Sequence, residues 1–573
     1  MDNARSGGLP GRLFLEIGGA LLLILVCASV FQIYTGVVEP PLVAYLGLFF
    51  TAFLPAAFIS YLLFPIVLTS CLLALFVFRY VDSYGMPMGD SYVAIMQSEL
   101  SEVGTYLVRN LTIQDAAMAL LVSLLFVLLV GRIAKRLREF RKITEKRTYY
   151  GVSIYLQLMI LMVLVMSGFN RDVSNSFELV SSAYAAFDKE RLSQQRLRHE
   201  LGDMTWPGSP IDSDFEGTVI MVLGESTTKH HLGIYGYPRD TTPALAARRD
   251  DLLIQTDTIS PHSHTVESVR EILSTANFDD GIAFEDRPKE NLLAALGSSG
   301  FKTFWLSNQN KYGIWDNIVS ILGQSADVSV FTRKSFGKVY SFKSYDEDLL
   351  PHLDSALQDP AKRKFIVLHT YSTHWDYCSF LPKEARAAIP HETLGPAFFG
   401  ESRDLSHYVN CYDNAVRYVD GFLEEVMQRV AQQADPSIMV YLPDHGEDVR
   451  TGTGHESDQH RHLHVEVPNV WYFNSPARAH FAEEILAFGD NANKRFKSSD
   501  FFHSMLDLIT DGGDLVRKDR SLFSLDYKSY DRTTVVRDED GVFVRYDSLE
   551  KDNKDYYERS RVSLMRAREQ NSE

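Results

Sequence analysis

Residues 217–226 read GTVIMVLGES, an unbroken apolar run that ends in a glycine and an acidic turn. Two later stretches repeat this form, KFIVLHTYS at 364–372 and SIMVYLPDHG at 437–446. Short apolar runs rich in β-branched residues are typical of strands that are buried on both faces. Sequences with helical character lie between them, at 265–276, 289–299 and 412–431. This alternation predicts an α/β domain whose mainly parallel sheet is covered by helices on both faces.

Metal-binding side chains follow all three runs. Glu225 follows the first, His369 and His374 end the second, and Asp444 and His445 end the third. Taken singly, each of these residues is more often structural than ligating. In open α/β sheets, however, ligands bind beyond the carboxyl ends of the strands. A Glu, an Asp and a His together suit Zn²⁺ and leave its fourth position open, as a catalytic site requires.

Thr265 ends the segment SPHSHT at 260–265, ahead of a helix that is predicted to begin near Val266. One interpretation makes Thr265 the N-cap of that helix. The other makes it a nucleophile, because a metal ion and the positive end of a helix favour the alkoxide and attract phosphate. The two interpretations are compatible. His374 and His455 could then bind phosphate oxygens or protonate a leaving alkoxide.

Residues 1–170 predict a transmembrane domain with five helices. Ile17–Val37 is uncharged and long enough to cross a bilayer. Pro41–Phe78 contains no charge and as one helix would measure roughly 57 Å, so we interpret it as two spans. Ala116–Val130 and Gly151–Gly168 complete the set.

The loops between the predicted spans indicate their orientation. The loop at 132–147, RIAKRLREFRKITEKR, has eight basic residues, which the positive-inside rule places in the cytoplasm. The loop at 81–112 has four acids and one arginine, which suits the opposite side. With five spans, everything after Gly168 lies outside the cytoplasm. We therefore expect a connector with an amphipathic helix at 171–215 and a periplasmic or extracellular domain at 216–573.

The C-terminal part is strongly acidic. Residues 1–170 hold twelve Lys and Arg against ten Asp and Glu, a balance of +2, so the chain's net charge of −17 leaves −19 for the rest. Nucleic acid is therefore not an expected partner, since phosphate binding needs clustered Lys and Arg. Four cysteines are too few for a disulfide scaffold. Cys378 and Cys411 are the candidates for one bridge, which the sequence alone leaves undecided.

A longer pattern joins these residues. GES at 224–226 is followed by YGYPRDTTP at 235–243, by Thr265 ahead of a helix, by YDN at 412–414 with Asp420, and by DHGE at 444–447. Together they resemble the signature of the bacterial phosphoethanolamine transferases. The resemblance extends over nearly the whole chain. It implies a multi-pass inner-membrane protein with five spans and a sulfatase/alkaline-phosphatase-like catalytic domain in the periplasm.

The resemblance also implies a ping-pong reaction. Thr265 would attack the phosphorus of phosphatidylethanolamine, a membrane lipid, and carry phosphoethanolamine after diacylglycerol leaves. The acceptor would be a hydroxyl or phosphate on the lipopolysaccharide core, lipid A or another envelope glycan, a modification associated with polymyxin resistance. Zn²⁺ would be bound by Glu225, Thr265, Asp444 and His445. His374 and His455 would bind the phosphate group.

Some positions depart from the family pattern. Trp375-Asp376 replaces the usual Gly-Pro after His374, which predicts a differently shaped pocket. The segment VRTGTGH at 449–455 is closer to the branch that modifies the lipopolysaccharide core than to the lipid A branch. Ser98 and Glu102 resemble a helix that positions lipid in relatives, although Ala94 replaces its asparagine.

Three alternatives stay open. A phosphoglycerol transferase of the lipoteichoic acid synthase type would use the same threonine and metal, although the motif at 235–243 argues against it. A membrane-anchored sulfatase or phosphatase would be a hydrolase, yet TVESV at 265–269 lacks the Pro and Arg of the sulfatase CxPxR setting. A transporter or sensor would need no catalysis, but the spans lack interior charges and all four predicted ligand positions hold competent side chains.

Overall fold

The computed structural model describes most of residues 195–534 together with 544–547. Its gaps there are 203–204, 209–210, 312–317, 334, 337–339, 342–343, 376, 391–402, 451–454 and 456–460. Before residue 195 it describes only 114, 117, 120, 121, 124, 128, 132 and 192. The chain divides into two compact units, Met1–Glu190 and Arg191–Glu573. The second unit is described below.

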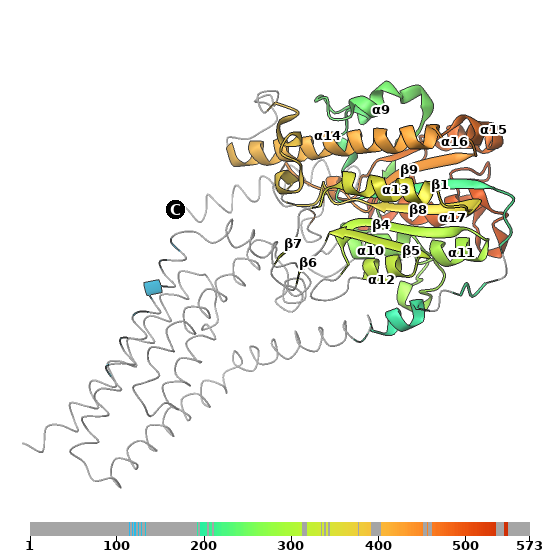
Figure 1. The fold of residues 1–573 in the computed structure, drawn as a ribbon, viewed down its shortest axis with the longest axis horizontal. Coiled ribbons are helices and arrows are strands. Elements are labelled where there is room, and N and C mark those ends of the chain that lie inside the picture. The colour runs from blue at the N-terminus through green and yellow to red at the C-terminus, as the bar shows by residue number, and fades with distance from the viewer. Residues whose placement is uncertain are drawn as a thin grey trace, which may run out of the picture. The chain divides into compact units, whose positions relative to one another are not determined.

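A seven-stranded sheet forms the centre of this unit, in the order β2-β10-β9-β1-β8-β4-β5 (Figure 1). Neighbours from β9 to β5 pair in parallel, whereas β10 is antiparallel to both β9 and β2. The expected mainly parallel sheet is therefore confirmed. Its strands are β1 (Gly217–Gly224), β2 (Leu252–Gln255), β4 (Lys302–Asn310), β5 (Val328–Arg333), β8 (Arg363–His369), β9 (Ser437–Pro443) and β10 (Asn469–Phe473).

The three apolar runs recognised in the sequence are the three central strands, β9, β1 and β8. All eight residues of β1 are buried. Val219, Met221 and Leu223 face one hydrophobic core, while Ile220 and Val222 face a second core on the other side of the sheet. Because both faces are covered, these strands are continuously apolar and show no polar alternation.

Helices cover the two faces, as Figure 1 shows. Residues of α10 (Thr265–Ile272), α11 (Leu292–Ser298), α12 (Ile318–Gln324) and α17 (Phe501–Ile509) belong to the first core. Residues of α9 (Pro243–Ala247), α13 (Leu350–Leu357) and α14 (Arg403–Ala431) belong to the second. α15 (Ser475–His480) and α16 (Ala482–Asn491) follow β10. The helices expected at 265–276, 289–299 and 412–431 correspond to α10, α11 and α14, although α14 begins at Arg403.

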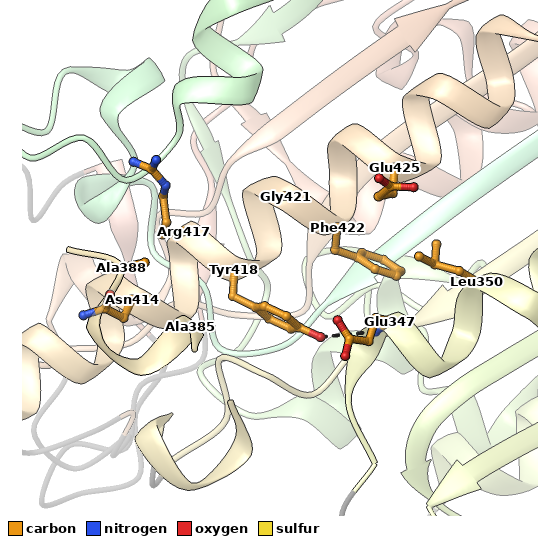
Figure 2. Close-up of a pocket in the computed structure, with 10 residues that line it drawn as sticks. All are labelled: Glu347, Leu350, Ala385, Ala388, Asn414, Arg417, Tyr418, Gly421, Phe422 and Glu425. Carbon is orange, nitrogen blue, oxygen red and sulfur yellow. Dashed lines mark hydrogen bonds between the residues drawn. The ribbon is translucent and has the colours of Figure 1, made fainter. Parts of the chain in front are cut away.

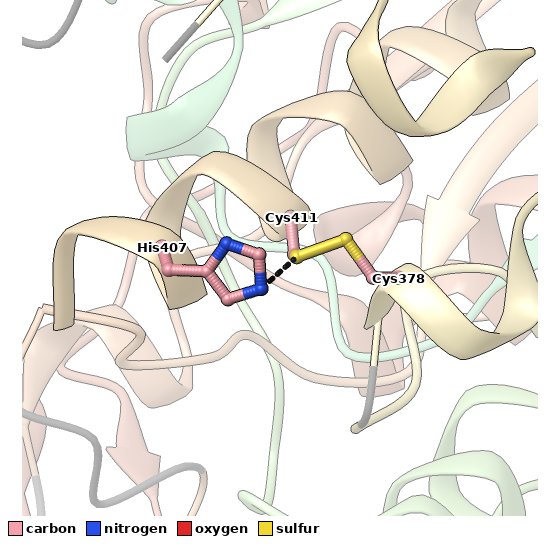
Figure 3. Close-up of side chains that lie close together, drawn as sticks. All are labelled: Cys378, His407 and Cys411. Atoms are coloured by element: carbon pink, nitrogen blue, oxygen red, sulfur yellow. Dashed lines mark hydrogen bonds between the residues drawn. A yellow bond between two sulfur atoms is a disulfide. The ribbon is translucent and has the colours of Figure 1, made fainter. Parts of the chain in front are cut away.

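Short strand pairs complete the described secondary structure: β3 (Thr258–Ile259) with β11 (Phe496–Lys497), β6 (Ser335–Phe336) with β7 (Tyr340–Ser341), and β12 (Thr533–Thr534) with β13 (Val544–Arg545). Cys378 and Cys411 form a disulfide that joins the 3-10 helix η6 (Tyr377–Phe380) to α14 (Figure 3). The exposed His407 ring lies 3.6 Å from the Cys411 sulfur. The bridge that the sequence left undecided is thus present.

Among the residues that the structure describes, no helix combines the length and the hydropathy needed to cross a bilayer. Four of the predicted spans, the amphipathic part of the connector, and Ser98 and Glu102 lie outside those residues. In the predicted fourth span, Ala117, Leu120, Leu121, Leu124 and Leu128 are described and are helical.

Candidate active site

Four side chains predicted to act together meet at the carboxyl ends of β1 and β9. Glu225 directly follows β1, Asp444 and His445 follow β9, and Thr265 is the first residue of α10. The Thr265 hydroxyl lies 3.2 Å from Glu225 Oε1 and 3.3 Å from His445 Nε2. His445 Nε2 lies 3.7 Å from Glu225 Oε1 and 3.6 Å from Asp444 Oδ2. Glu225, Asp444 and His445 are all buried and offer ligand atoms within 4.8 Å of one another.

Thr265 is not the cap of its helix. The N-cap of α10 is His264, whose side chain makes no capping hydrogen bond, and the helix begins at Thr265, one residue before the expected start. The Thr265 hydroxyl is directed to Glu225 and His445 instead. The capping interpretation is therefore wrong, and the positive end of α10 stands beside the acidic cluster.

The hydrogen bonds around Asp444 and His445 leave ligand atoms free for a cation. Asp444 Oδ1 accepts the backbone N–H groups of Ser226 and His445, at 2.9 and 2.7 Å. Its Oδ2 is buried and has no hydrogen-bond partner among the described residues. His445 Nδ1 lies 2.7 Å from the carbonyl oxygen of Gly446 and must donate to it, so the lone pair of Nε2 faces the cluster.

The negative charges of this cluster also favour the binding of a cation. Burial and the neighbouring Asp444 carboxylate raise the pKa of Glu225 well above its usual value. Burial raises the pKa of Asp444 to about 6. Two buried carboxylates so close together destabilise the folded protein unless a positive charge neutralises them. Two carboxylate oxygens, an imidazole nitrogen and a nearby hydroxyl match the ligands that Zn²⁺ accepts, so the residues present fit that ion.

A strained turn after β1 shapes the cluster. Ser226 has a φ of 44°, in the left-handed region that ordinary side chains avoid. Tyr412 of α14 holds this turn, because its hydroxyl donates to the Ser226 carbonyl (2.8 Å) and accepts the Thr228 N–H (3.0 Å). The turn aims the Ser226 N–H at Asp444.

His455 lies against the cluster, with its ring centroid 4.6 Å from that of His445. Its Nδ1 lies 2.8 Å from Glu447 Oε2, and the Tyr377 hydroxyl donates to the other oxygen of Glu447 at 2.5 Å. Burial alone would lower the pKa of His455, but the charge and hydrogen bond of Glu447 outweigh it and raise that pKa. Its charged form is therefore favoured relative to that of a free histidine, and its Nε2 lies on the side of the ring away from the contact with Glu447.

His374 is the neutral counterpart of His455. Its ring stacks on Tyr371 with centroids 4.5 Å apart, and its buried Nδ1 has no hydrogen-bond partner among the described residues. Burial lowers its pKa to about 3. An uncharged buried ring with an unused nitrogen is suited to a hydrogen bond with a ligand.

The motif at 235–243 packs around α14 and lies outside the cluster. Buried Asp413 accepts hydrogen bonds from Tyr237, at 2.8 Å, and from Arg239, and it lies 2.7 Å from His231 Nδ1. Asp420 caps α9 by accepting the N–H groups of Ala244 and Leu245, at 2.8 and 3.0 Å. Since Tyr412 precedes Asp413, this network fixes the helix that supports the Ser226 turn.

Sequence reasoning missed three residues. Gln309 donates a 2.7 Å hydrogen bond to Glu225 Oε2, and Tyr377 holds Glu447. Asp346 is fully buried and accepts the N–H groups of Tyr371 and Ser372, just before His374. The sequence does contain a signal that could have identified Gln309. KTFWLSNQN at 302–310 has a short apolar stretch that ends in polar residues, as the other strands of the site do. His369, which was expected among metal-type groups, is not in the cluster and lies beside Gln309.

A pocket of about 430 Å³ lies elsewhere, between α14, α13 and nearby turns. Figure 2 shows Tyr418 and Phe422 of α14 facing Glu347 and Leu350 across it. None of the four clustered residues lines this pocket.

Comparison with known proteins agrees with this fold and cluster. Residues 217–511 match the sulfatase family, so the chain belongs to that family of α/β proteins. It is 25% identical over 342 residues to phosphoethanolamine transferase EptC of Escherichia coli O18:K1:H7, which covers 58% of this chain and 57% of that protein. The chain thus matches somewhat over half the length of this curated relative. The resemblance to phosphoethanolamine transferases is confirmed.

Two solved structures share the fold. The periplasmic domain of EcEptC from Escherichia coli, crystallised with Zn, has a TM-score of 0.54 at 22% identity and covers 60% of this chain and 97% of that chain. The integral membrane protein lipooligosaccharide phosphoethanolamine transferase A from Neisseria meningitidis has a TM-score of 0.56 at 18% identity. That match covers 91% of this chain and 93% of the other.

Proposed function

We propose that this protein is a zinc-dependent phosphotransferase that moves phosphoethanolamine from phosphatidylethanolamine to an envelope glycolipid or glycan. The observation that carries the proposal is the Thr265 hydroxyl, 3.2 and 3.3 Å from Glu225 and His445 at the start of α10. The names of its relatives support the choice of phosphoethanolamine as the transferred group. EptC from Escherichia coli crystallised with Zn supports the choice of metal.

Glu225, Asp444, His445 and Thr265 would hold the zinc ion. When bound, the ion supplies positive charge that lowers the pKa of the threonine hydroxyl and neutralises phosphate oxygens. The unpaired Asp444 Oδ2 and the free lone pair of His445 Nε2 support this assignment.

In the first half-reaction, Thr265 Oγ1 forms a bond to the phosphorus of the lipid while the bond from phosphorus to the diacylglycerol oxygen breaks. The hydroxyl proton is released to solvent before the attack, because Glu225 Oε1, the oxygen 3.2 Å from the hydroxyl, is assigned to the metal. His455, whose pKa Glu447 raises, is suited to give a proton to the departing diacylglycerol oxygen, and neutral His374 to bind a phosphate oxygen. In the second half-reaction, an acceptor hydroxyl attacks the same phosphorus and its proton passes to His455, while the bond from phosphorus to Thr265 Oγ1 breaks.

Membrane anchoring is part of the proposal. We assign residues 1–170 to a five-span inner-membrane domain, 171–215 to a connector and 216–573 to a periplasmic catalytic domain. The exposed side chains of Leu120, Leu121, Leu124 and Leu128, which line one side of a helix, support a lipid-facing surface in this region. Ser98 and Glu102 remain proposed contacts for the lipid donor. The segment at 449–455 favours the lipopolysaccharide core over lipid A as acceptor.

The covalent step can be tested by measuring the intact mass of the zinc-loaded protein after incubation with phosphatidylethanolamine. We expect a phosphoethanolamine adduct on Thr265 that disappears in Thr265→Ala, together with roughly a thousandfold or greater loss of transfer. Thr256→Ala, which removes an exposed threonine hydroxyl outside the cluster, should keep the adduct.

Other outcomes of the same experiment favour the alternatives. An adduct formed only from phosphatidylglycerol would indicate a phosphoglycerol transferase. Release of free phosphoethanolamine without any acceptor would indicate a hydrolase. Active zinc-loaded protein that never carries an adduct would rule out the covalent mechanism. Profiling envelope lipids and glycans from cells with and without the protein would identify the acceptor.

A further inference from the structure

We propose that Gln309 and His369 are positioning residues that hold Glu225 in the orientation required for cation binding. The inference rests on the zinc site proposed above and deepens it. Neither residue belongs to the cluster itself. His369 contacts Gln309, and Gln309 in turn contacts Glu225, so His369 acts on Glu225 only through Gln309.

The sheet order brings the three residues together. In the order β1-β8-β4, His369 ends the middle strand and is in register with Leu223 of β1 and Ser307 of β4. Glu225 lies two residues beyond Leu223, and Gln309 two residues beyond Ser307. Gln309 and Glu225 approach each other across the end of β8, with Gln309 Nε2 2.7 Å from Glu225 Oε2.

An irregularity in β4 occurs at this point. Its register with β5 shifts between Ser307 and Asn310, as in a β-bulge. Bulges change the direction of side chains and are common beside active sites. The backbone N–H of Gln309 donates to its neighbour Ser307 Oγ at 3.0 Å, which fixes the bulged segment.

The chemistry of these side chains fixes which atom donates and which accepts in each of the two hydrogen bonds. Gln309 Nε2 lies 2.7 Å from Glu225 Oε2 and 2.9 Å from His369 Nε2. A carboxylate accepts, so the amide must present its NH₂ group, whose second hydrogen faces His369 Nε2 at 2.9 Å and, at a longer 3.4 Å, the Thr370 carbonyl oxygen. The shorter contact makes His369 Nε2 an acceptor, because two N–H groups could not approach so closely. The His369 proton is therefore on Nδ1, which lies 3.3 Å from Ser307 Oγ. Burial lowers the pKa of His369 to about 3, which keeps the ring neutral as this arrangement needs.

This arrangement separates the two oxygens of Glu225. Oε2 is engaged by Gln309, while Oε1 accepts a 2.8 Å hydrogen bond from the Ser226 hydroxyl and faces the Thr265 hydroxyl and His445 Nε2. The carboxylate is thereby prevented from rotating, and one oxygen remains directed at the cation position. Partners that orient a ligand in this way typically contribute a factor of about 10 to 100 in metal affinity.

The test is the zinc dissociation constant of the purified full-length chain, measured by competition with a chromophoric chelator. Gln309→Met keeps a side chain of similar size but removes the donor, and should weaken zinc binding roughly 10- to 100-fold. His369→Phe keeps an aromatic ring against Trp305, whose ring centroid is 5.6 Å from that of His369. This variant should lose less zinc affinity than Gln309→Met. In the double variant the two losses should not add, because His369 acts only through Gln309.

Gln428→Leu is the matched control. Gln428 also donates to a carboxylate, Glu424 at 2.8 Å, but on the exposed surface of α14. Its loss should leave the zinc dissociation constant unchanged. The melting temperatures of the metal-free variants show whether a loss of affinity reflects general unfolding. Gln309→Asn gives a second measurement, because the shorter amide cannot reach both partners and should bind zinc as weakly as Gln309→Met.

The outcomes are distinguishable. If the unaltered protein binds zinc tightly and Gln309→Met and Gln309→Asn bind it equally well, the positioning role is overturned while the zinc site stands. If the unaltered protein binds zinc no better than Asp444→Ala, the zinc site fails and the positioning role fails with it.

Discussion

At the scale of single residues, the candidate site depends on charges that are kept in specific states by their neighbours. Glu447 raises the pKa of His455, whereas burial lowers the pKa values of His374 and His369 to about 3 and keeps both rings neutral. The pKa of the same residue type is thus shifted in opposite directions within one site. In the proposed reaction, a protonated histidine can give a proton to a leaving oxygen, and a neutral ring can donate its one N–H to a phosphate oxygen.

The lowered pKa of His369 makes the stability of the folded protein depend on pH. Its pKa falls from 6.5 to about 3 on folding, so below pH 6.5 the unfolded chain binds a proton that the folded chain does not. Stability is therefore lost as the pH falls, by at most about 1.4 kcal/mol per pH unit from this group. We expect His369→Phe to lose less stability between pH 6.5 and 5 than the unaltered protein.

Urea unfolding of the full-length chain at pH 7.5, 6.5 and 5 would measure this difference. Between pH 7.5 and 6.5 the two proteins should differ in their change by only about 0.4 kcal/mol, since the unfolded His369 is only half protonated at pH 6.5. Parallel loss of stability in both proteins below pH 6.5 would contradict the prediction.

At the scale of elements, the site is held by contacts between segments that are distant in the chain. Tyr412 of α14 fixes the Ser226 turn, and Tyr377 of η6 fixes Glu447. The Cys378–Cys411 disulfide joins these two elements one residue away from each tyrosine. Gly446 allows another close contact, because a Cβ there would lie 2.1 Å from the Leu463 carbonyl oxygen.

Removing the disulfide should therefore destabilise the described unit. The two cysteines are 33 residues apart, and closing a loop of that length corresponds to about 3 to 4 kcal/mol. We expect Cys378→Ala/Cys411→Ala to lower the urea midpoint accordingly under non-reducing conditions. The unaltered protein under reducing conditions should approach the same value.

Cys27→Ala/Cys71→Ala is the control for this prediction, because it removes two cysteines that do not take part in the bridge. Its midpoint should stay at that of the unaltered protein. A double Cys378/Cys411 variant as stable as the unaltered protein would show that the bridge adds nothing to the folded state.

At the scale of the whole molecule, the proposed arrangement separates a membrane domain from a catalytic domain on the outer side. Arg132–Arg147 would then face the cytoplasm and all residues after Gly168 the periplasm. This arrangement would give the site access to a lipid donor and an envelope acceptor on the same side of the membrane.

Cysteine labelling tests this topology. In a chain with Cys27 and Cys71 replaced by alanine, we expect Ser298→Cys, at an exposed position of α11, to react with an impermeant maleimide in spheroplasts. Thr144→Cys, in the basic loop, should react only after the inner membrane is opened. Labelling of both positions in intact spheroplasts, or of neither, would contradict five spans.

Much of the fold could be predicted because its signals are local. The runs at 217–224 and 437–443 are apolar along their whole length, which identifies them as central strands before any contact is known. Glu225, Asp444, His445 and Thr265 could be grouped because parallel strands end at one edge of the sheet. The order of strands in the sheet was not predicted, since nothing local specifies which buried strands are neighbours.

The sequence by itself determined the type of domain and the donor atoms available at its active edge, because apolar periodicity and side-chain chemistry are properties of short segments. Only the tertiary structure decided how those atoms are used. In the structure, His264 and not Thr265 is the N-cap of α10. His369 lies against Gln309 and not among the metal-type groups, and Cys378 is bonded to Cys411. Each of these depends on the position of a neighbour far away in the chain, which strand order and helix packing set.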